Sequence, residues 1–203
     1  MIQNIKNWFF ALVDDYMHAR YGKRKSVLFK DHPKEVIEIG AGYGANFRYL
    51  KSGTRVIAVE PNSSLRDILK KRAERFGIIL EIHHGGAEEL LIPDNHVEMV
   101  LGSLVLCSVN DPIQVVSEIK RVLKAGGRFA YLEHVKAREG SWVYGIQRMV
   151  RKPWKCFFDG CHVTRDTGKL IQNSGFKNVD QQAFNSRTIF VPIIPHISGV
   201  AVK

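Results

Sequence analysis

Cysteine is scarce in this chain of 203 residues, and long apolar runs are missing from it. The three cysteines, Cys107, Cys156 and Cys161, show no C-x-x-C spacing, so they indicate neither a disulfide framework nor a zinc site, and we expect no bound metal. No segment approaches the ~18 to 20 consecutive apolar residues that span a bilayer, and no secretory signal is recognisable. We therefore expect a cytoplasmic protein of a reducing compartment, either soluble or peripheral on the cytosolic face of a membrane.

Acidic residues are outnumbered by basic ones, at 20 Asp and Glu against 30 Lys and Arg. The formal charge of +10 favours an anionic partner surface, such as phospholipid headgroups or nucleic acid, although a charge excess also simply keeps a protein in solution. The chain length and the hydrophobic fraction of 45% fit one domain with a substantial core and leave little chain for a second.

Glycine gathers in one stretch, EVIEIGAGYGAN, which runs from Glu35 to Asn46. Its apolar beginning is rich in β-branched residues, which favours a strand covered on both faces. Gly40 begins a turn, and Gly42 lets the loop pass close to a bound cofactor. Gly44 with Ala45 lets a following helix begin with its amides directed at that cofactor. The stretch therefore predicts a nucleotide-binding turn that extends to Asn46.

The glycine spacing alone leaves two cofactors open. Gly40, Gly42 and Ala45 also satisfy the G-x-G-x-x-A form of the dinucleotide fingerprint, which would bind NAD. Glu60 lies at the spacing where an acid binds the ribose hydroxyls. Glu38 favours another ligand, because a carboxylate at the end of the first strand would repel a pyrophosphate but attract an ammonium and a sulfonium group. S-adenosylmethionine carries both groups, and we take it as the expected cofactor.

Strand and helix patterns alternate along most of the chain. This alternation implies a parallel sheet with right-handed crossovers. The last two expected strands have no helix between them and predict an antiparallel hairpin, an arrangement typical of S-adenosylmethionine methyltransferases. The expected strands are 36–39, 55–59, 78–83, 97–103, 128–132, 178–184 and 196–202, and helices are expected over 3–20, 65–76 and 112–123, the last one closed by Gly126 and Gly127.

Candidate ligand contacts lie at the carboxyl ends of the expected strands, the edge at which open α/β sheets bind ligands. Glu60 ends the second strand and is placed to bind both ribose hydroxyls. The loop after the third strand leaves backbone amides free to meet an adenine, and the apolar run LVLCSV after the fourth is expected to line the cofactor pocket. Beyond the glycine loop, the expected contacts are Glu60, Pro61, Asn62, Gly86, Ala87, Glu88, Ser103 and Leu104.

Two segments accompany the domain expected over residues 31–203. Residues 1–30 join the first helix to the basic run HARYGKRK and are expected to form a cap, a lid or a membrane-surface element. Residues 141–163 form an insert after the fifth strand, which predicts a substrate pocket with walls from Trp154 and Phe157, or else plain core packing. The expected pocket residues are Trp154, Phe158, Asp159, Cys161, His162 and Arg165.

Several stretches together resemble the methyltransferase-like thiol S-methyltransferases, membrane-associated enzymes that methylate small aliphatic thiols. They are EIGAGYGANF, VEPN, LVLCSV, RVLKAGG, EHV, FFDGC, TR and PHISGVAVK, and the likeness covers residues 16–203 in order. The glycine loop is common to all class I methyltransferases, whereas FFDGC and the C-terminal stretch are narrower signals. We expect one short helix in this chain where the animal enzymes have a hydrophobic anchor. The resemblance implies a class I Rossmann-like fold and methyl transfer from S-adenosylmethionine.

These observations predict a methyltransferase for a small, largely apolar acceptor, with an alkyl thiol favoured. A thiol must ionise to react, and His134 at the end of the fifth strand is the candidate base, unless the charge of the donor suffices without one. A phospholipid or quinone methyltransferase at a membrane surface is the alternative enzyme. A non-catalytic basic protein that holds RNA or a membrane is the alternative class, but Glu38 and Glu60 argue against it, so no nucleic acid partner is expected.

Overall fold

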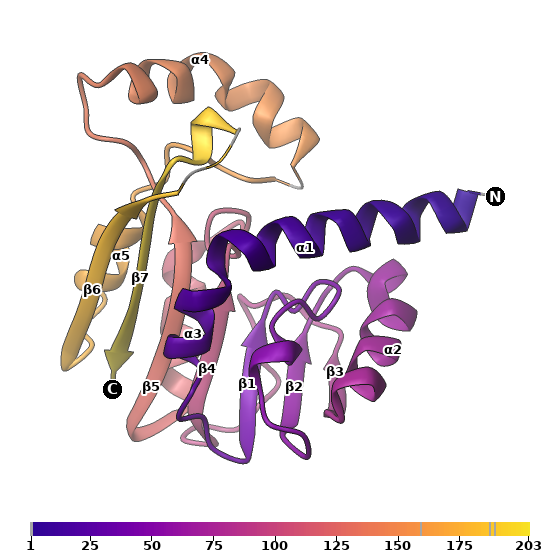
Figure 1. Ribbon diagram of the computed structural model, residues 1–203. Coiled ribbons are helices and arrows are strands. Elements are labelled where there is room, and N and C mark those ends of the chain that lie inside the picture. Colours follow the sequence, from indigo (N-terminus) through magenta and orange to yellow (C-terminus); the bar gives the residue numbers. More distant parts are fainter. Residues whose placement is uncertain (1, 159, 187, 189) are drawn as a thin grey trace.

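A seven-stranded sheet forms the centre of the protein (Figure 1). The computed structural model describes residues 2–158, 160–186, 188 and 190–203, with side chains described from residue 15 onward. The strands are β1 (Glu35–Ile39), β2 (Arg55–Val59), β3 (Ile79–His83), β4 (Val97–Ser103), β5 (Leu123–His134), β6 (Asn178–Asn185) and β7 (Pro195–Val202). They lie in the order β3-β2-β1-β4-β5-β7-β6. β1 to β5 are parallel and β7 is antiparallel to both of its neighbours, which confirms the predicted sheet and its C-terminal hairpin.

Helices cover both faces of this sheet. They are α1 (Ile2–Leu28), α2 (Arg66–Phe76), α3 (Pro112–Val122), α4 (Trp142–Phe157) and α5 (Thr167–Gln172), with 3-10 turns η1 (Phe47–Tyr49), η2 (Ser63–Leu65) and η3 (Val191–Ile193). In Figure 1, α1 and α2 lie in front of the sheet, α3 and α5 lie behind it, and α4 lies beyond the carboxyl end of β5. The segment 141–163, predicted as an insert, therefore contains a helix that lies beyond the carboxyl ends of the parallel strands.

β1 shows how the sequence builds two cores. Side chains alternate across a strand, so neighbouring residues face opposite sides of the sheet. Ile37 and Ile39 pack into the cluster that contains α3 and α5, whereas Val36 packs with Phe29 on the side of α1 and α2. Glu38 shares the face of Val36, so its carboxylate lies on the side of the sheet that α1 covers.

α1 is longer than the predicted helix, because it continues through the basic run to Leu28. Its second half packs on β5 and β7, with Tyr21 buried and its hydroxyl 2.9 Å from Nε2 of His196. The helix predicted over residues 3–20 lies within α1, but its side chains up to residue 14 lie outside the described residues. In the part of the chain that the structure describes, no helix combines the length and the apolar character needed to cross a bilayer.

Two local predictions were wrong. The glycine loop leads only into the three-residue turn η1, because the side chain of Asn46 bonds to other side chains instead of capping a helix. Gly126 and Gly127 do not end α3. That helix stops at Val122, and both glycines lie inside β5, which begins at the next residue.

Candidate active site

The loop after β1 uses left-handed backbone at three glycines. Gly40, Gly42 and Gly44 have φ values of +63°, +56° and +77°, which other residues rarely adopt. A Cβ on Gly40 would collide with Val105, and a Cβ on Gly44 would lie 2.8 Å from the ring of Phe47. A Cβ on Gly42 would meet nothing within 4 Å. Gly42 therefore borders open space, where bare backbone can approach a ligand.

Glu38 ends β1 with a buried carboxylate. Its Oε1 accepts a hydrogen bond from Nδ2 of Asn46 at 2.8 Å, and Oδ1 of Asn46 accepts one from Nζ of the buried Lys25 at 2.7 Å. Burial raises the pKa of Glu38 to about 7, against the opposing effects of Asn46 and Lys25. Oε2 of Glu38 has no hydrogen-bond partner among the described residues, which leaves it for a donor on a ligand.

Glu60 joins the ends of β1 and β2. Its Oε2 accepts the amide of Gly42 and its Oε1 accepts the amide of Asn62, both at 2.8 Å. A carboxylate has further lone pairs, so Glu60 can also accept two ribose hydroxyls. Pro61 and Asn62 follow at the surface, where the side chain of Asn62 caps η2.

Ser103 and Leu104 end β4 at the same edge. Oγ of Ser103 is buried and lacks a hydrogen-bond partner within the described ranges. Leu104 has a φ of +57°, a strained value for a residue with a side chain, and such strain is typical of functional sites. In the loop after β3, Oε1 of Glu88 accepts the amide of Asn110 at 2.9 Å, which ties residues 86–88 to the segment before α3.

These groups fit S-adenosylmethionine. Open space at Gly42 allows the cofactor to touch the backbone, and Glu60 offers acceptors for its ribose. The oxygens of Glu38 and Ser103 that lack a partner among the described residues are buried, and that of Glu38 suits an ammonium group. All four residues lie at the carboxyl ends of the adjacent strands β2, β1 and β4, where open α/β sheets bind ligands.

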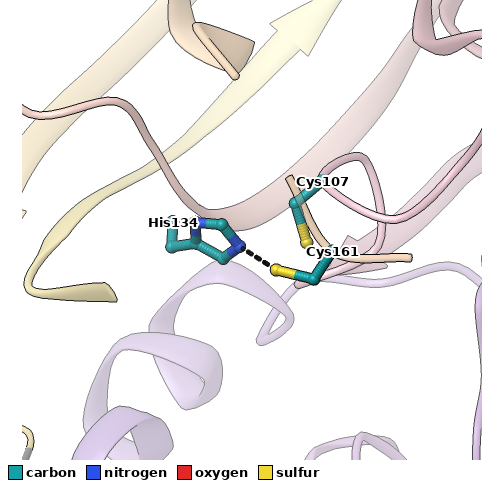
Figure 2. A group of neighbouring side chains, drawn as sticks. All are labelled: Cys107, His134 and Cys161. Carbon is teal, nitrogen blue, oxygen red and sulfur yellow. Dashed lines mark hydrogen bonds between the residues drawn. The ribbon is translucent and has the colours of Figure 1, made fainter. Parts of the chain in front are cut away.

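Three side chains from separate segments meet beyond β5. Figure 2 shows Cys107 from the loop after β4, His134 at the end of β5 and Cys161 from the loop after α4. All three are buried, and Nε2 of His134 lies 3.1 Å from Sγ of Cys161. Hydrogen bonds with Cys107, His134 and the indole of Trp154 hold the pKa of Cys161 below its usual range. The bond with Cys161, together with burial, raises the pKa of Cys107.

Glu133 and Arg165 fix the loop that carries Cys107. Oε1 of the buried Glu133 accepts the amides of Val105 and Leu106 at 3.0 and 3.2 Å, and burial raises the pKa of Glu133 to about 7. Nη1 of Arg165 donates to the carbonyls of Leu106 and Val109 at 2.6 and 2.8 Å. Arg165, which the sequence predicts as a pocket residue, therefore positions the loop of Cys107 by hydrogen bonds to the backbone carbonyls of that loop.

Aromatic rings of the insert lie next to the cysteine pair. Trp154 stacks on Phe158 with ring centroids 4.1 Å apart, and Phe190 meets both rings edge-on. Phe157 was expected in the same wall, but it is 81% exposed and therefore contributes little to that wall. Asp159, another predicted pocket residue, lies outside the described residues.

His162 follows Cys161 and connects two parts of the site through its backbone. Its amide donates to the carbonyl of Cys107 at 2.8 Å, which holds the two cysteine segments side by side. Burial, and then the charge of Arg165, lowers the pKa of its ring.

Sequence reasoning missed four residues that build this site. Glu133 and Lys25 are buried charges, and Gln147 of α4 anchors the insert by donating to the carbonyls of Val135 and Pro192. The fourth is Cys107, which the sequence placed in the apolar run expected to line the cofactor pocket but did not connect with His134 or Cys161. A charged residue at the end of an apolar strand was a usable signal for Glu133, whereas the others depend on contacts between distant segments.

Comparison with known proteins agrees with this geometry. Residues 37–131 match a family model described as a methyltransferase domain. Over 171 residues, the chain is 37% identical to the thiol S-methyltransferase TMT1B of Rattus norvegicus and 34% identical to TMT1A of Homo sapiens, covering 83% of this chain and 70% of each relative. A solved S-adenosylmethionine-dependent methyltransferase from Thermotoga maritima has the same fold, with a TM-score of 0.69, 20% identity, and coverage of 100% of this chain and 96% of that one.

The fold and the match to a methyltransferase domain thus define a class I methyltransferase whose methyl donor is S-adenosylmethionine. Within this class, the chain belongs to the family of the thiol S-methyltransferases TMT1A and TMT1B.

Proposed function

We propose that this enzyme methylates a small, largely apolar thiol. The observation that carries the proposal is the buried pair of His134 and Cys161 beside the stacked rings of Trp154 and Phe158, at the sheet edge that holds the cofactor residues. Apolar, aromatic walls suit a small uncharged acceptor. The identity of 34% to 37% with enzymes named thiol S-methyltransferases supports the same acceptor class.

The protein contributes mainly by positioning the reactants. When bound, S-adenosylmethionine supplies an electrophilic methyl group. Glu38 would hold the ammonium group of this donor and Glu60 its ribose, and the insert would place the acceptor opposite its methyl group. Fixing two reactants in line can supply ~7 to 11 kcal/mol of a barrier in favourable cases.

The acceptor sulfur must be ionised before it attacks. A free thiol with a pKa of ~8.5 is mostly protonated at neutral pH. The sequence predicts His134 as the base, and its Nε2 faces Sγ of Cys161 at 3.1 Å. In our proposal the acceptor sulfur lies next to this contact, where both groups can influence its proton.

A screen with isotope-labelled S-adenosylmethionine tests the proposal. We expect labelled thioethers from alkyl thiols, and no product from a Gly42→Val protein that has lost the cofactor site. Product from phospholipids, quinones or phenols, and never from thiols, would refute the thiol acceptor and leave the methyltransferase intact. Turnover of no acceptor would favour a binding role.

We also propose that α1 carries the enzyme to an anionic membrane surface. The net charge of +10 supports this, as does the N-terminal half of α1, which extends away from the sheet in Figure 1. Exposed Arg20 and Lys23 are suitable for replacement by Gln, whereas Lys25 is buried beside Asn46 and has to be left intact. Weaker binding of the double variant to anionic vesicles, with activity on soluble thiols unchanged, is the expected result. Equal binding would contradict the proposal.

A further inference from the structure

Cys107, His134 and Cys161 present three potential metal ligands in one buried place (Figure 2). Their two sulfurs and a ring nitrogen all lie within 4.8 Å of one another. Ligands of a tetrahedral zinc ion, with Zn–S near 2.3 Å and Zn–N near 2.0 Å, stand about 3.3 to 3.8 Å apart. Small side-chain movements therefore suffice for these three atoms to surround an ion.

The surroundings of the three side chains suit a metal thiolate. Nε1 of Trp154 donates to Sγ of Cys161 at 3.2 Å, and such outer hydrogen bonds orient the ligands of metal sites. The loop of Cys107 is held by Glu133 and Arg165, so the ligand positions are fixed by the fold. When both cysteines bind an ion as thiolates, the two buried negative charges need a counter-charge, which a divalent cation supplies.

We infer that Cys107, His134 and Cys161 bind a zinc ion, and that this ion receives the sulfur of the acceptor thiol. Two thiolates and one imidazole leave a fourth position, as in zinc sites that bind substrate and unlike closed structural sites with four protein ligands. A thiol that coordinates zinc loses its proton, so the ion would perform the activation assigned above to His134 as a base. This second step rests on the proposed function, whereas the metal site itself does not.

The chemistry balances without a further reagent. The S–H bond of the acceptor breaks, its proton leaves to solvent, and the sulfur is held on zinc as a thiolate. A lone pair of this sulfur forms the new S–CH3 bond, while the electrons of the donor's C–S bond return to the donor sulfur, which becomes neutral. Zinc with two cysteine thiolates is neutral overall, so the bound acceptor keeps a full negative charge and is attracted to the cationic donor.

Metal content tests the site independently of activity. The full-length protein is reduced with a phosphine, loaded with zinc or cobalt(II), and separated from free metal. We expect about one ion per chain for the parent and for Cys156→Ser, a matched control in which an exposed cysteine is removed. Cys107→Ser and Cys161→Ser should each retain less than about a tenth of this amount. The cobalt protein should show a thiolate-to-metal absorption band that both variants lack.

A second variant guards against misfolding of the cysteine variants. Trp154→Phe keeps an aromatic ring but removes the hydrogen bond to Cys161, and we expect it to weaken zinc binding about tenfold. If the reduced parent protein takes up no more zinc or cobalt than Cys161→Ser, the metal site is refuted, and a disulfide between Cys107 and Cys161 before reduction would then explain their proximity.

Adding alkyl thiols to the cobalt protein separates the two steps. A shift of the absorption band that saturates with thiol, and that an alcohol of the same length does not produce, is expected if the acceptor binds the ion. Metal binding without such a shift would refute the acceptor role and keep the site. A failed thiol-methylation screen with the metal bound would refute the proposed function alone.

Discussion

Oε2 of Glu60 accepts the amide of Gly42 at 2.8 Å, so the acid that ends β2 is bonded to the glycine loop that follows β1. Its Oε1 is fixed in the same way by the amide of Asn62. The carboxylate is therefore held in position by backbone groups. Binding a ribose then requires little further ordering of the site, which favours affinity.

Glu60→Gln should weaken cofactor binding by roughly 10- to 100-fold, because hydrogen bonds to charged groups contribute ~1.5 to 3 kcal/mol. The carboxylate accepts hydrogen bonds from two backbone N–H groups. In the glutamine variant, the side-chain NH2 group would face one of these donors and that hydrogen bond would be lost. The measurement is the rise in melting temperature with S-adenosylhomocysteine, which stabilises the folded state by mass action.

Glu74→Gln, at an exposed position of α2, is the control for the loss of a carboxylate and should respond like the parent. NAD should stabilise none of these proteins. Stabilisation of the parent by NAD and not by adenosyl compounds would contradict the cofactor assignment.

Gly42→Ala should lower cofactor affinity at least about tenfold. Its φ of +56° makes any side chain strained, by about 1 kcal/mol, and the added methyl group enters the space beside the loop. Gly53→Ala is a matched control, because Gly53 also has a positive φ, +84°, and open space, but lies in the turn before β2. Both variants should lose similar stability on urea unfolding, and only Gly42→Ala should bind S-adenosylmethionine weakly. Equal affinities would show that the loop is only a turn.

Cofactor affinity should rise about tenfold between pH 6 and pH 8. Burial raises the pKa of Glu38 to about 7, and only the ionised form attracts a cationic ligand, so the competent fraction grows across this range. Isothermal titration at several pH values checks this. Glu38→Gln should bind weakly at every pH, with a flat profile, and an unchanged slope in this variant would assign the effect to another group.

The same group affects folding in the opposite direction. Because the pKa of Glu38 in the folded state lies above its ordinary value of 4.5, its contribution to stability is complete below pH 4.5 and is lost as the pH rises through about 7. The cofactor-free parent should therefore lose part of its free energy of unfolding over this range. Burial also raises the pKa of Glu133 to about 7, so this residue adds a second loss of stability over the same pH range. Glu38→Gln keeps only the loss from Glu133, and its free energy of unfolding should therefore decrease less than that of the parent.

The sequence could propose cofactor contacts because their signals are local. In the sequence, β1, β2 and β4 are short apolar runs. The glycine, the acid or the serine at which each run stops marks a candidate ligand contact. Strand β4 was predicted with its correct limits, Val97–Ser103. The helix expected after Gly44 was wrong, since the side chain of Asn46 is used by Glu38 and Lys25.

The sulfur cluster could not be predicted in this way. His134 and Cys161 are 27 residues apart, and they meet only because α4 carries the chain out beyond β5 and back. Cys107 joins them because β4 and β5 are neighbours in the sheet. No spacing rule contains this information, and Cys107 in an apolar run reads as a core residue until the third segment is placed.

Phe158→Ala should raise KM for apolar thiols about tenfold and leave kcat for saturating thiol within about twofold. Phe158 is 42% exposed and its ring stacks on Trp154, so it offers apolar surface that an acceptor can cover, and losing that contact removes on the order of 1.5 kcal/mol of binding. Phe157→Ala is the adjacent control, since that side chain is 81% exposed and contributes no wall. Kinetics with thiols of increasing chain length provide the test, and equal effects of the two variants would place the acceptor elsewhere.

His134→Ala should lower kcat for thiols about 100-fold or more while the cofactor dissociation constant changes by less than about twofold. The reason is its location, since the ring lies at the end of β5 and contacts Cys161, whereas the proposed cofactor groups Glu38 and Glu60 lie on β1 and directly after β2. His196→Gln is the control for a buried histidine nearby. His196 lies opposite His134 in the sheet and bonds to Tyr21, so the variant should lose stability and keep its turnover per folded molecule.

Single-turnover rates over pH 6 to 9 separate two roles for His134. If the ring is a base, the variant should regain activity at high pH, where the thiol ionises by itself. If the ring holds zinc, high pH should restore little, and the variant should also bind the metal weakly. A variant with unchanged kcat would exclude a role of His134 in activating the thiol, whether as a base or through zinc.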